Sequence, residues 1–309
     1  MTMSLLQGPT PQQMEAIRAE LGEDPDRLQH NIQLLQKWIS CQVHLPRDYD
    51  NNLLPVFLRG CKHNLERAKK KLEMYFIVRT KVPELFGDRE PTKELMERYT
   101  KMIKIATLPK LTPDGSRITI FKVMCLNGDE WDTIEMIRYI YMNADIRVAE
   151  EVPISGDIFI YDLENLKTVH ILKYASPILK KALVAAQEAY PQRLKQLHYV
   201  NTPPFTEKIL NITKSFMKEK MRDRFIVHNS MDDLLKYFPS DILPVEYAGT
   251  SGKFNNLVND WVDCIVKRRK WFQQQDNIKA TGPIPECVSY SHFDDVIGVQ
   301  GSFRKLEID

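Results

Sequence analysis

Apolar side chains between residues 10 and 80 recur at three- and four-residue spacings, the pattern of amphipathic helices that pack on one another. Gly22 and the Asp24-Pro25 pair mark the end of a first helix. Asn64, a residue type that caps helix N-termini, begins a later one. The apolar positions that define these helices are Met14, Ile17, Leu21, Leu28, Ile32, Leu35, Ile39, Leu65, Ala68, Leu72, Tyr75 and Phe76. The segment therefore predicts a small helical bundle.

The pattern changes at Asp114-Gly115, a dipeptide typical of turns, after a stretch from Pro83 to Pro113 that is punctuated by prolines. Beyond this turn, short apolar runs that favour strands are separated by segments with helical spacing. We expect strands at 117–123, 157–163, 197–200 and 225–228, and helices at 131–150, 176–189, 231–237 and 257–274. Strands that alternate with helices predict an α/β domain with a parallel or mixed sheet.

The run from Val200 to Arg224 combines an apolar helical stripe with a basic end. On a helical wheel, Phe205, Ile209, Ile212 and Phe216 fall together, and polar residues fall opposite. Leu210, Met217 and Met221 continue the apolar stripe. Lysine and arginine then alternate at Lys218, Lys220, Arg222 and Arg224. The pattern alone favours a surface helix packed on a core. The sharper interpretation is a lid over an apolar cavity, hinged at Pro203-Pro204, with a basic end that faces a membrane.

Composition narrows the class of protein. The 309 residues fit one large domain, or a small domain beside a larger one, and a net charge of +2 means that any basic function is local. The absence of a run of 18 uncharged apolar residues argues against a transmembrane helix, and the first residues lack the pattern of a secretory signal. Five scattered cysteines are typical of reduced thiols. We therefore expect a cytoplasmic protein.

The motifs of common enzymes are missing from the sequence. It contains neither a GxSxG nucleophile elbow nor an HExxH zinc motif, and its seven histidines show no metal-ligand spacing. The segment Gly249–Phe254 looks like a phosphate loop only superficially, because no serine or threonine follows Lys253. We expect no catalytic residues, no metal and no cofactor.

Four blocks of sequence resemble the CRAL-TRIO lipid-binding family. They are FLRGCKHNLERAKKKLEMY at 57–75, IYDLENL at 160–166, AYPQRLKQLHYVNTPPF at 189–205 and FPSDILPVEYAG at 238–249. The resemblance extends from about Leu28 to Phe272, and members that transfer α-tocopherol or bind retinaldehyde look most similar. It implies an N-terminal helical domain at 1–90, a CRAL-TRIO domain at 91–275 with a lid helix at about 201–221, and a tail at 276–309 packed on the surface. The expected fold is α/β, with a mostly parallel sheet that floors an apolar pocket.

This fold, taken with the apolar pattern, gives candidates for the pocket wall. Ile158 and Ile160 alternate with Phe159 and Tyr161, so only one pair can face the pocket, and the isoleucines are our candidates for the floor. The other wall candidates are Met136, Tyr139, Ile140, Asn143, Ile178, Leu183, Ala186 and Leu194, with Phe205, Ile209, Ile212 and Phe216 from the lid. For each of them, ordinary core packing is an equal alternative.

The resemblance also implies a phosphoinositide-binding site beside the lid. The matching basic positions are Arg193, Lys220 and Arg224, whereas Cys61 occupies a fourth position that is basic in the tocopherol-transfer members. Arg59 or Lys62 would have to compensate. Ordinary solvated charge is the alternative interpretation of these residues.

The expected function is intracellular binding and intermembrane transfer of a small hydrophobic lipid, α-tocopherol or a related isoprenoid. Phosphoinositide-containing membranes would promote lid opening, so the protein would associate with membranes transiently. Neither nucleic acid nor a transmembrane segment is expected. Two alternatives are a lipid-responsive sensor or scaffold that binds a retinoid, carotenoid or phospholipid, and an enzyme whose site the sequence does not reveal.

Overall fold

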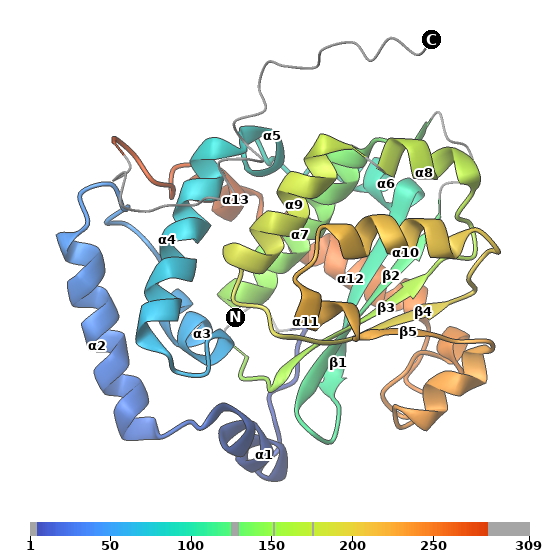
Figure 1. Cartoon of the computed structure of the whole chain (residues 1–309), viewed down its shortest axis with the longest axis horizontal. Helices are drawn as coiled ribbons and strands as arrows, with labels where there is room; N and C mark the ends of the chain where they lie inside the picture. Colours follow the sequence, from blue (N-terminus) through green and yellow to red (C-terminus); the bar gives the residue numbers. More distant parts are fainter. Residues whose placement is uncertain (1–4, 125–129, 151, 175, 284–309) are drawn as a thin grey trace.

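Helices form the N-terminal part of the chain, as the apolar spacing predicts (Figure 1). The computed structural model describes residues 5–124, 130–150, 152–174 and 176–283. The first helices are α1 (Pro11–Leu21), α2 (Pro25–Cys41), α3 (Leu53–Gly60), α4 (Leu65–Lys81), α5 (Pro83–Phe86) and α6 (Lys93–Met102). Gly22 ends α1 with a φ of 64°, and the Asn64 side chain accepts a hydrogen bond from the Arg67 N–H at the start of α4.

The sheet is mostly parallel, and its strands follow one another in chain order. The strands are β1 (Ile103–Leu111), β2 (Ser116–Val123), β3 (Gly156–Asp162), β4 (Leu194–Val200) and β5 (Phe225–Val227). Only the β1–β2 pair is antiparallel among the described pairs. The α/β fold class and the helical N-terminal region are thereby confirmed.

Helices cover both faces of the sheet (Figure 1). On one side lie α7 (Thr133–Ala149), α8 (Thr168–Tyr174), α9 (Pro177–Glu188), α10 (Thr206–Ser215) and α11 (Glu219–Arg222). On the other side follow η2 (Met231–Lys236), η3 (Val245–Tyr247) and α12 (Phe254–Lys267), and then α13 (Arg269–Gln275) near α4. His198 of β4 is buried on this second side, where its ring contacts Tyr237 and Phe238.

Three predicted helices differ from the structure. The segment 231–237 forms a 3₁₀ helix, and 257–274 forms two helices that meet at Arg268. The lid is also two helices, α10 and α11, instead of one helix over 201–221. The break between them lies at Phe216–Lys218, where the α10 hydrogen-bond pattern ends.

A buried ion cluster connects the N-terminal helices to the α/β part. Asp145 of α7 accepts hydrogen bonds from Arg79 at 2.7 Å, Arg89 at 2.5 Å and the Tyr190 hydroxyl at 2.6 Å. The apolar core is also continuous across the two parts. The domain borders at residues 90 and 275 stay predictions.

The beginning of the predicted tail packs against α4. Ala280 is buried, its N–H donates to the Phe76 carbonyl at 3.0 Å, and its carbonyl accepts from the Thr80 hydroxyl at 2.6 Å. Residues 284–309, the rest of the tail, lie outside the described residues.

Candidate functional site

A cavity of about 680 Å³ lies between the sheet and the helices α7, α9, α10 and α11. This volume falls in the range of roughly 300–1,000 Å³ that is typical of small-molecule sites. Its walls include apolar residues of the sheet and helices together with basic residues near the N-terminal ends of the parallel strands. The cavity therefore has an apolar body and a basic end.

Aromatic rings form much of the cavity floor. Phe121, Tyr161 and Tyr199 occupy matching register positions on β2, β3 and β4, and all three line the cavity. Their rings stack in a row, with centroids 4.9 Å and 5.2 Å apart, and Phe225 of β5 continues the row at 5.7 Å. Neighbouring parallel strands place matched side chains on one face, which explains the row.

The floor candidates on β3 were on the wrong face. Phe159 and Tyr161 line the cavity, whereas Ile158 and Ile160 are buried on the opposite side of the sheet. Side chains alternate along a strand, so the choice of one pair excludes the other. Both faces of this strand are covered, and the apolar pattern alone could not distinguish them.

The helix α7 supplies a side wall. Met136, Ile140 and Asn143 line the cavity because spacings of four and three residues place them on one face of the helix. Tyr139 does not line it. Its ring instead lies 5.4 Å from the Tyr99 ring of α6. The Asn143 side chain donates to the Tyr139 carbonyl at 2.8 Å.

Leu183 and Ala186 of α9 and Leu194 of β4 also line the cavity, whereas Ile178 packs on the core outside it. Contact between any of the lining residues and a ligand stays a prediction.

The lid contacts the cavity through the far end of the apolar stripe rather than through the four lid candidates. Thr213, Met217 and Met221 line the cavity. Phe205, Ile212 and Phe216 are half-buried and do not line it, and the side chain of Ile209 lies outside the described residues. The wheel treats the run as one helix, whereas α10 ends at Ser215, so that Met217 lies in the break and Met221 in α11.

Gln187 of α9 holds the break in the lid. Its side-chain amide donates to the Phe216 carbonyl at 2.9 Å and its side-chain oxygen accepts from the Lys218 N–H at 2.9 Å. The Phe216 carbonyl and the Lys218 N–H have no partner within a helix because the lid is broken between them. The Gln187 side chain supplies a hydrogen bond to each. At the other end, the Thr206 hydroxyl donates to the Pro203 carbonyl at 2.6 Å.

Nine lysine and arginine residues line the cavity, and we call five of them the basic rim. They are Lys62, Arg67, Arg193, Lys220 and Arg224. Lys62 and Arg193 pair with Glu20, whereas Arg67, Lys220 and Arg224 have no ion-pair partner in the described part of the chain. Desolvation, followed by the positive charges of Arg67, Lys218 and Arg224, lowers the pKa of Lys220. Unbalanced positive charge at one mouth favours an anion there.

Arg67 is the rim residue that the sequence did not reveal. It projects from the first turn of α4, while Cys61, at the position of the expected fourth cation, is buried. Of the two proposed substitutes, Lys62 is in the rim, but Arg59 binds Glu23 at 2.8 Å and 3.2 Å and lines a separate cavity of about 60 Å³. The run of basic residues at 67–71 was the only available signal.

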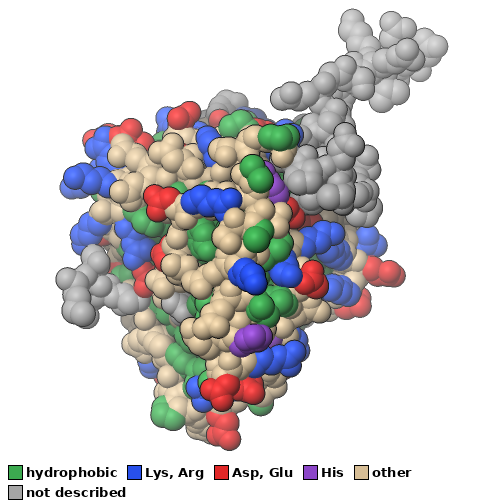
Figure 2. Space-filling view, turned by 90° about the vertical axis from the view of Figure 1, so that its left-hand side faces the viewer, with side chains coloured by type: hydrophobic (Ala, Val, Ile, Leu, Met, Phe, Trp, Pro, Cys, Tyr) green, Lys and Arg blue, Asp and Glu red, His purple; other side chains and the backbone are tan. Residues whose placement is uncertain are grey.

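The side of the N-terminal helices carries charges of both signs. Figure 2 shows the side of the N-terminal helices, where basic and acidic side chains are intermixed.

In the described ranges, no cluster of histidine, cysteine, aspartate or glutamate could hold a metal ion. Within the same ranges, no helix combines the length and apolar character needed to cross a bilayer.

Comparisons with known proteins agree with this architecture. Residues 101–249 match the CRAL/TRIO domain model, and residues 24–96 match a model described as a Pinta-like UBA domain. The chain therefore carries a CRAL/TRIO domain, as the sequence blocks indicated. The human protein named alpha-tocopherol transfer protein-like is similar at 29% identity, over 88% of this chain and 78% of that one.

Human clavesin-2 is similar at 25% identity, over 78% of this chain and 75% of that one. Among solved structures, that of Sfh5 aligns with a TM-score of 0.44 and 14% identity, over 81% of this chain and 99% of that chain.

Proposed function

We propose that this protein binds a small hydrophobic lipid in its cavity and transfers the lipid between membranes. The cargo we propose is α-tocopherol or a related isoprenoid, in keeping with the name of the human relative at 29% identity. The observation that carries the proposal is the continuity of one cavity from an aromatic floor to the basic rim. A lipid would bury its apolar part on the floor while the rim contacts a membrane.

The energetics of such a cargo favour transfer over free release. A lipid with a few hundred Å² of apolar surface gains on the order of 10 kcal/mol when it leaves water, at about 25 cal/mol per Å². Release into water would therefore be very slow. A bilayer offers comparable apolar surroundings, so exchange between the cavity and a membrane is close to balanced in free energy.

The basic rim gives the membrane a way to act on the lid. Lys220 belongs to α11, whereas Arg193 and Arg224 directly precede β4 and β5 of the fixed sheet. An anionic phosphoinositide headgroup that binds Lys220 together with Arg193 and Arg224 would pull on the lid at α11, beside its junction with α10. Each cation near an anionic leaflet contributes about 1 kcal/mol, which makes docking weak and reversible. The protein would work in the cytoplasm and associate with membranes only transiently.

The test is a vesicle-to-vesicle transfer assay with fluorescent α-tocopherol and the variant Lys220→Ala/Arg224→Ala. Removal of two rim cations should slow transfer to phosphoinositide-containing acceptor vesicles by about tenfold or more, given about 1 kcal/mol for each cation. Transfer to neutral acceptor vesicles should change little.

The matched control is Arg27→Ala/Lys37→Ala, which removes the same charge from exposed positions of α2. A rim variant that transfers at the wild-type rate would refute the docking step. Mass spectrometry of lipids that co-purify with the native protein tests the cargo separately. Recovery of a retinoid, carotenoid or phospholipid without transfer activity would favour the sensor alternative.

A further inference from the structure

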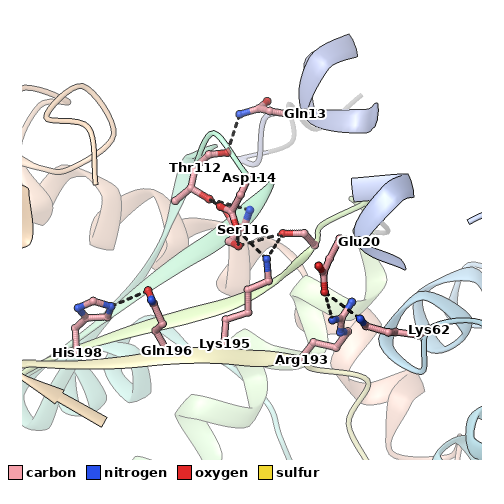
Figure 3. Close-up of polar contacts among 11 residues, drawn as sticks. Gln13, Glu20, Lys62, Thr112, Asp114, Ser116, Arg193, Lys195, Gln196 and His198 are labelled. Atoms are coloured by element: carbon pink, nitrogen blue, oxygen red, sulfur yellow. Dashed lines mark hydrogen bonds and ion pairs between the residues drawn. The ribbon is translucent and has the colours of Figure 1, made fainter. Parts of the chain in front are cut away.

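Glu20, at the end of α1, covers two cations of the basic rim (Figure 3). Its carboxylate oxygen Oε1 lies 2.8 Å from Arg193 Nη2 and 3.1 Å from Lys62 Nζ. The hydrogen bond from Arg193, then that from Lys62, lowers the pKa of Glu20. The carboxylate is therefore ionised at neutral pH, and the protein itself supplies an anion to its own rim.

The backbone that carries Glu20 is fixed beside the mouth. Ile17 and Leu21 of α1 are buried against Leu111 of β1. The Gln13 side chain donates to the carbonyls of Leu111 at 3.2 Å and Thr112 at 3.0 Å. The Glu20 side chain, in contrast, is 41% exposed. A side chain in this position can leave its cations without any change in the helix.

From this arrangement we infer that Glu20 is a specificity-determining residue of the basic rim. It selects membrane lipids whose headgroups carry phosphomonoesters over lipids with a single negative charge. The inference rests on the proposed docking of the rim on an anionic headgroup.

The physical reason is that a headgroup must displace the Glu20 carboxylate from Lys62 and Arg193. When a headgroup with one negative charge displaces the carboxylate, the two cations exchange one single charge for another, and little binding free energy is gained. A phosphomonoester carries a charge of about −1.5 to −2 and three acceptor oxygens, so it exchanges with a net gain. Exposed ion pairs are individually weak, which makes the displacement reversible.

The test compares Glu20→Gln with wild type by co-sedimentation with two kinds of vesicle. Both consist of phosphatidylcholine, with either phosphatidylserine or a phosphatidylinositol bisphosphate added to equal total charge. Wild type should prefer the bisphosphate vesicles. The variant should bind phosphatidylserine vesicles about threefold to tenfold more tightly, the strength of two ordinary exposed ion pairs. Its gain on bisphosphate vesicles should be smaller, so the preference falls.

Glu15→Gln is the matched control, because Glu15 lies exposed on the same helix, outside the ion pairs around Glu20. Equal effects of the two variants would show a long-range charge effect and overturn the inference, as would an unchanged preference in Glu20→Gln. If Lys220→Ala/Arg224→Ala loses vesicle binding while Glu20→Gln behaves as Glu15→Gln, only the role of Glu20 fails. If wild type binds neither vesicle, the proposed docking fails as well.

Discussion

Asp145 shows how much depends on a single side chain. It is 1% exposed, and two guanidinium groups that are themselves buried bind its carboxylate. Burial by itself disfavours the charged carboxylate, but Arg79 and Arg89 outweigh it and lower the pKa of Asp145. The Arg79 guanidinium also lies 3.5 Å above the centre of the Tyr75 ring. The group is therefore a fully ionic cluster inside the protein.

We expect Asp145→Asn to destabilise the fold by about 3–5 kcal/mol, because it leaves two buried cations without a counter-charge. Urea unfolding monitored by circular dichroism measures the change. Asp263→Asn, an exposed carboxylate on α12, is the control, and it should alter the free energy of unfolding by less than about 0.5 kcal/mol. A similar stability for the two variants would contradict the ionic interpretation of the cluster.

The lowered pKa of Asp145 also determines how the free energy of unfolding changes with pH. Because the folded pKa lies below the unfolded value of about 3.9, the stabilisation is fully present above that value. It is lost as the pH falls through the lowered pKa of the folded protein. The stability gap between wild type and Asp145→Asn should therefore narrow only in strong acid.

Single residues also mark where sequence reasoning ends. The alternation along β3 identifies two sets of side chains, but both faces of the sheet are covered, so Phe159 and Ile160 look equally suited to a core. Arg67 is one of several basic residues in its helix, and only the packing of α4 beside the mouth distinguishes it. These choices depend on contacts between segments far apart in the chain.

At the scale of elements, the lid is two short helices, and hydrogen bonds from Gln187 of α9 hold the break between them. The apolar spacing from Phe205 to Met221 predicts one continuous helix. The hydrogen bonds of Gln187 to Phe216 and Lys218 stabilise the break, and no local signal in the lid encodes that partner. β1 escaped prediction for a related reason, since Pro109 interrupts its alternation at a shift in strand register.

We expect Gln187→Ala to loosen the lid, because two backbone groups at the break lose their partner. Each lost hydrogen bond costs about 1 kcal/mol, so amide hydrogen exchange across residues 206–222 should speed up by about tenfold or more. Exchange in the sheet should stay unchanged. Gln274→Ala on α13 serves as the control. Equal exchange rates in the lid of wild type and Gln187→Ala would show that the Gln187 hydrogen bonds do not stabilise the lid.

At the scale of the whole molecule, the cavity lies within one continuous apolar core. The fold class, the helical N-terminal region and the CRAL/TRIO domain were all predictable, because they follow from long periodic segments and ordered sequence blocks. The shape of the cavity was not, since it is the space left over after all elements have packed.

Occupation of the cavity should stabilise the whole fold. A ligand at about 100 times its dissociation constant adds about 2.7 kcal/mol, because it binds only the folded protein. We expect the melting temperature of delipidated protein to rise when α-tocopherol is added in detergent. Cholesterol at the same concentration provides a comparison for ligand shape. An unchanged melting temperature with α-tocopherol would contradict its assignment as cargo.

The contact between Ala280 and α4 bears on the order of events during synthesis. The Ala280 backbone bonds to the Phe76 carbonyl and the Thr80 hydroxyl, about 200 positions earlier in the chain. A domain that emerges first from the ribosome would usually fold first. Here the surface of α4 at Phe76 and Thr80 is complete only after residues near 280 have been synthesised. This part of α4 therefore stays exposed on the nascent chain during most of translation. Until residues near 280 cover it, it is a surface to which a chaperone can bind.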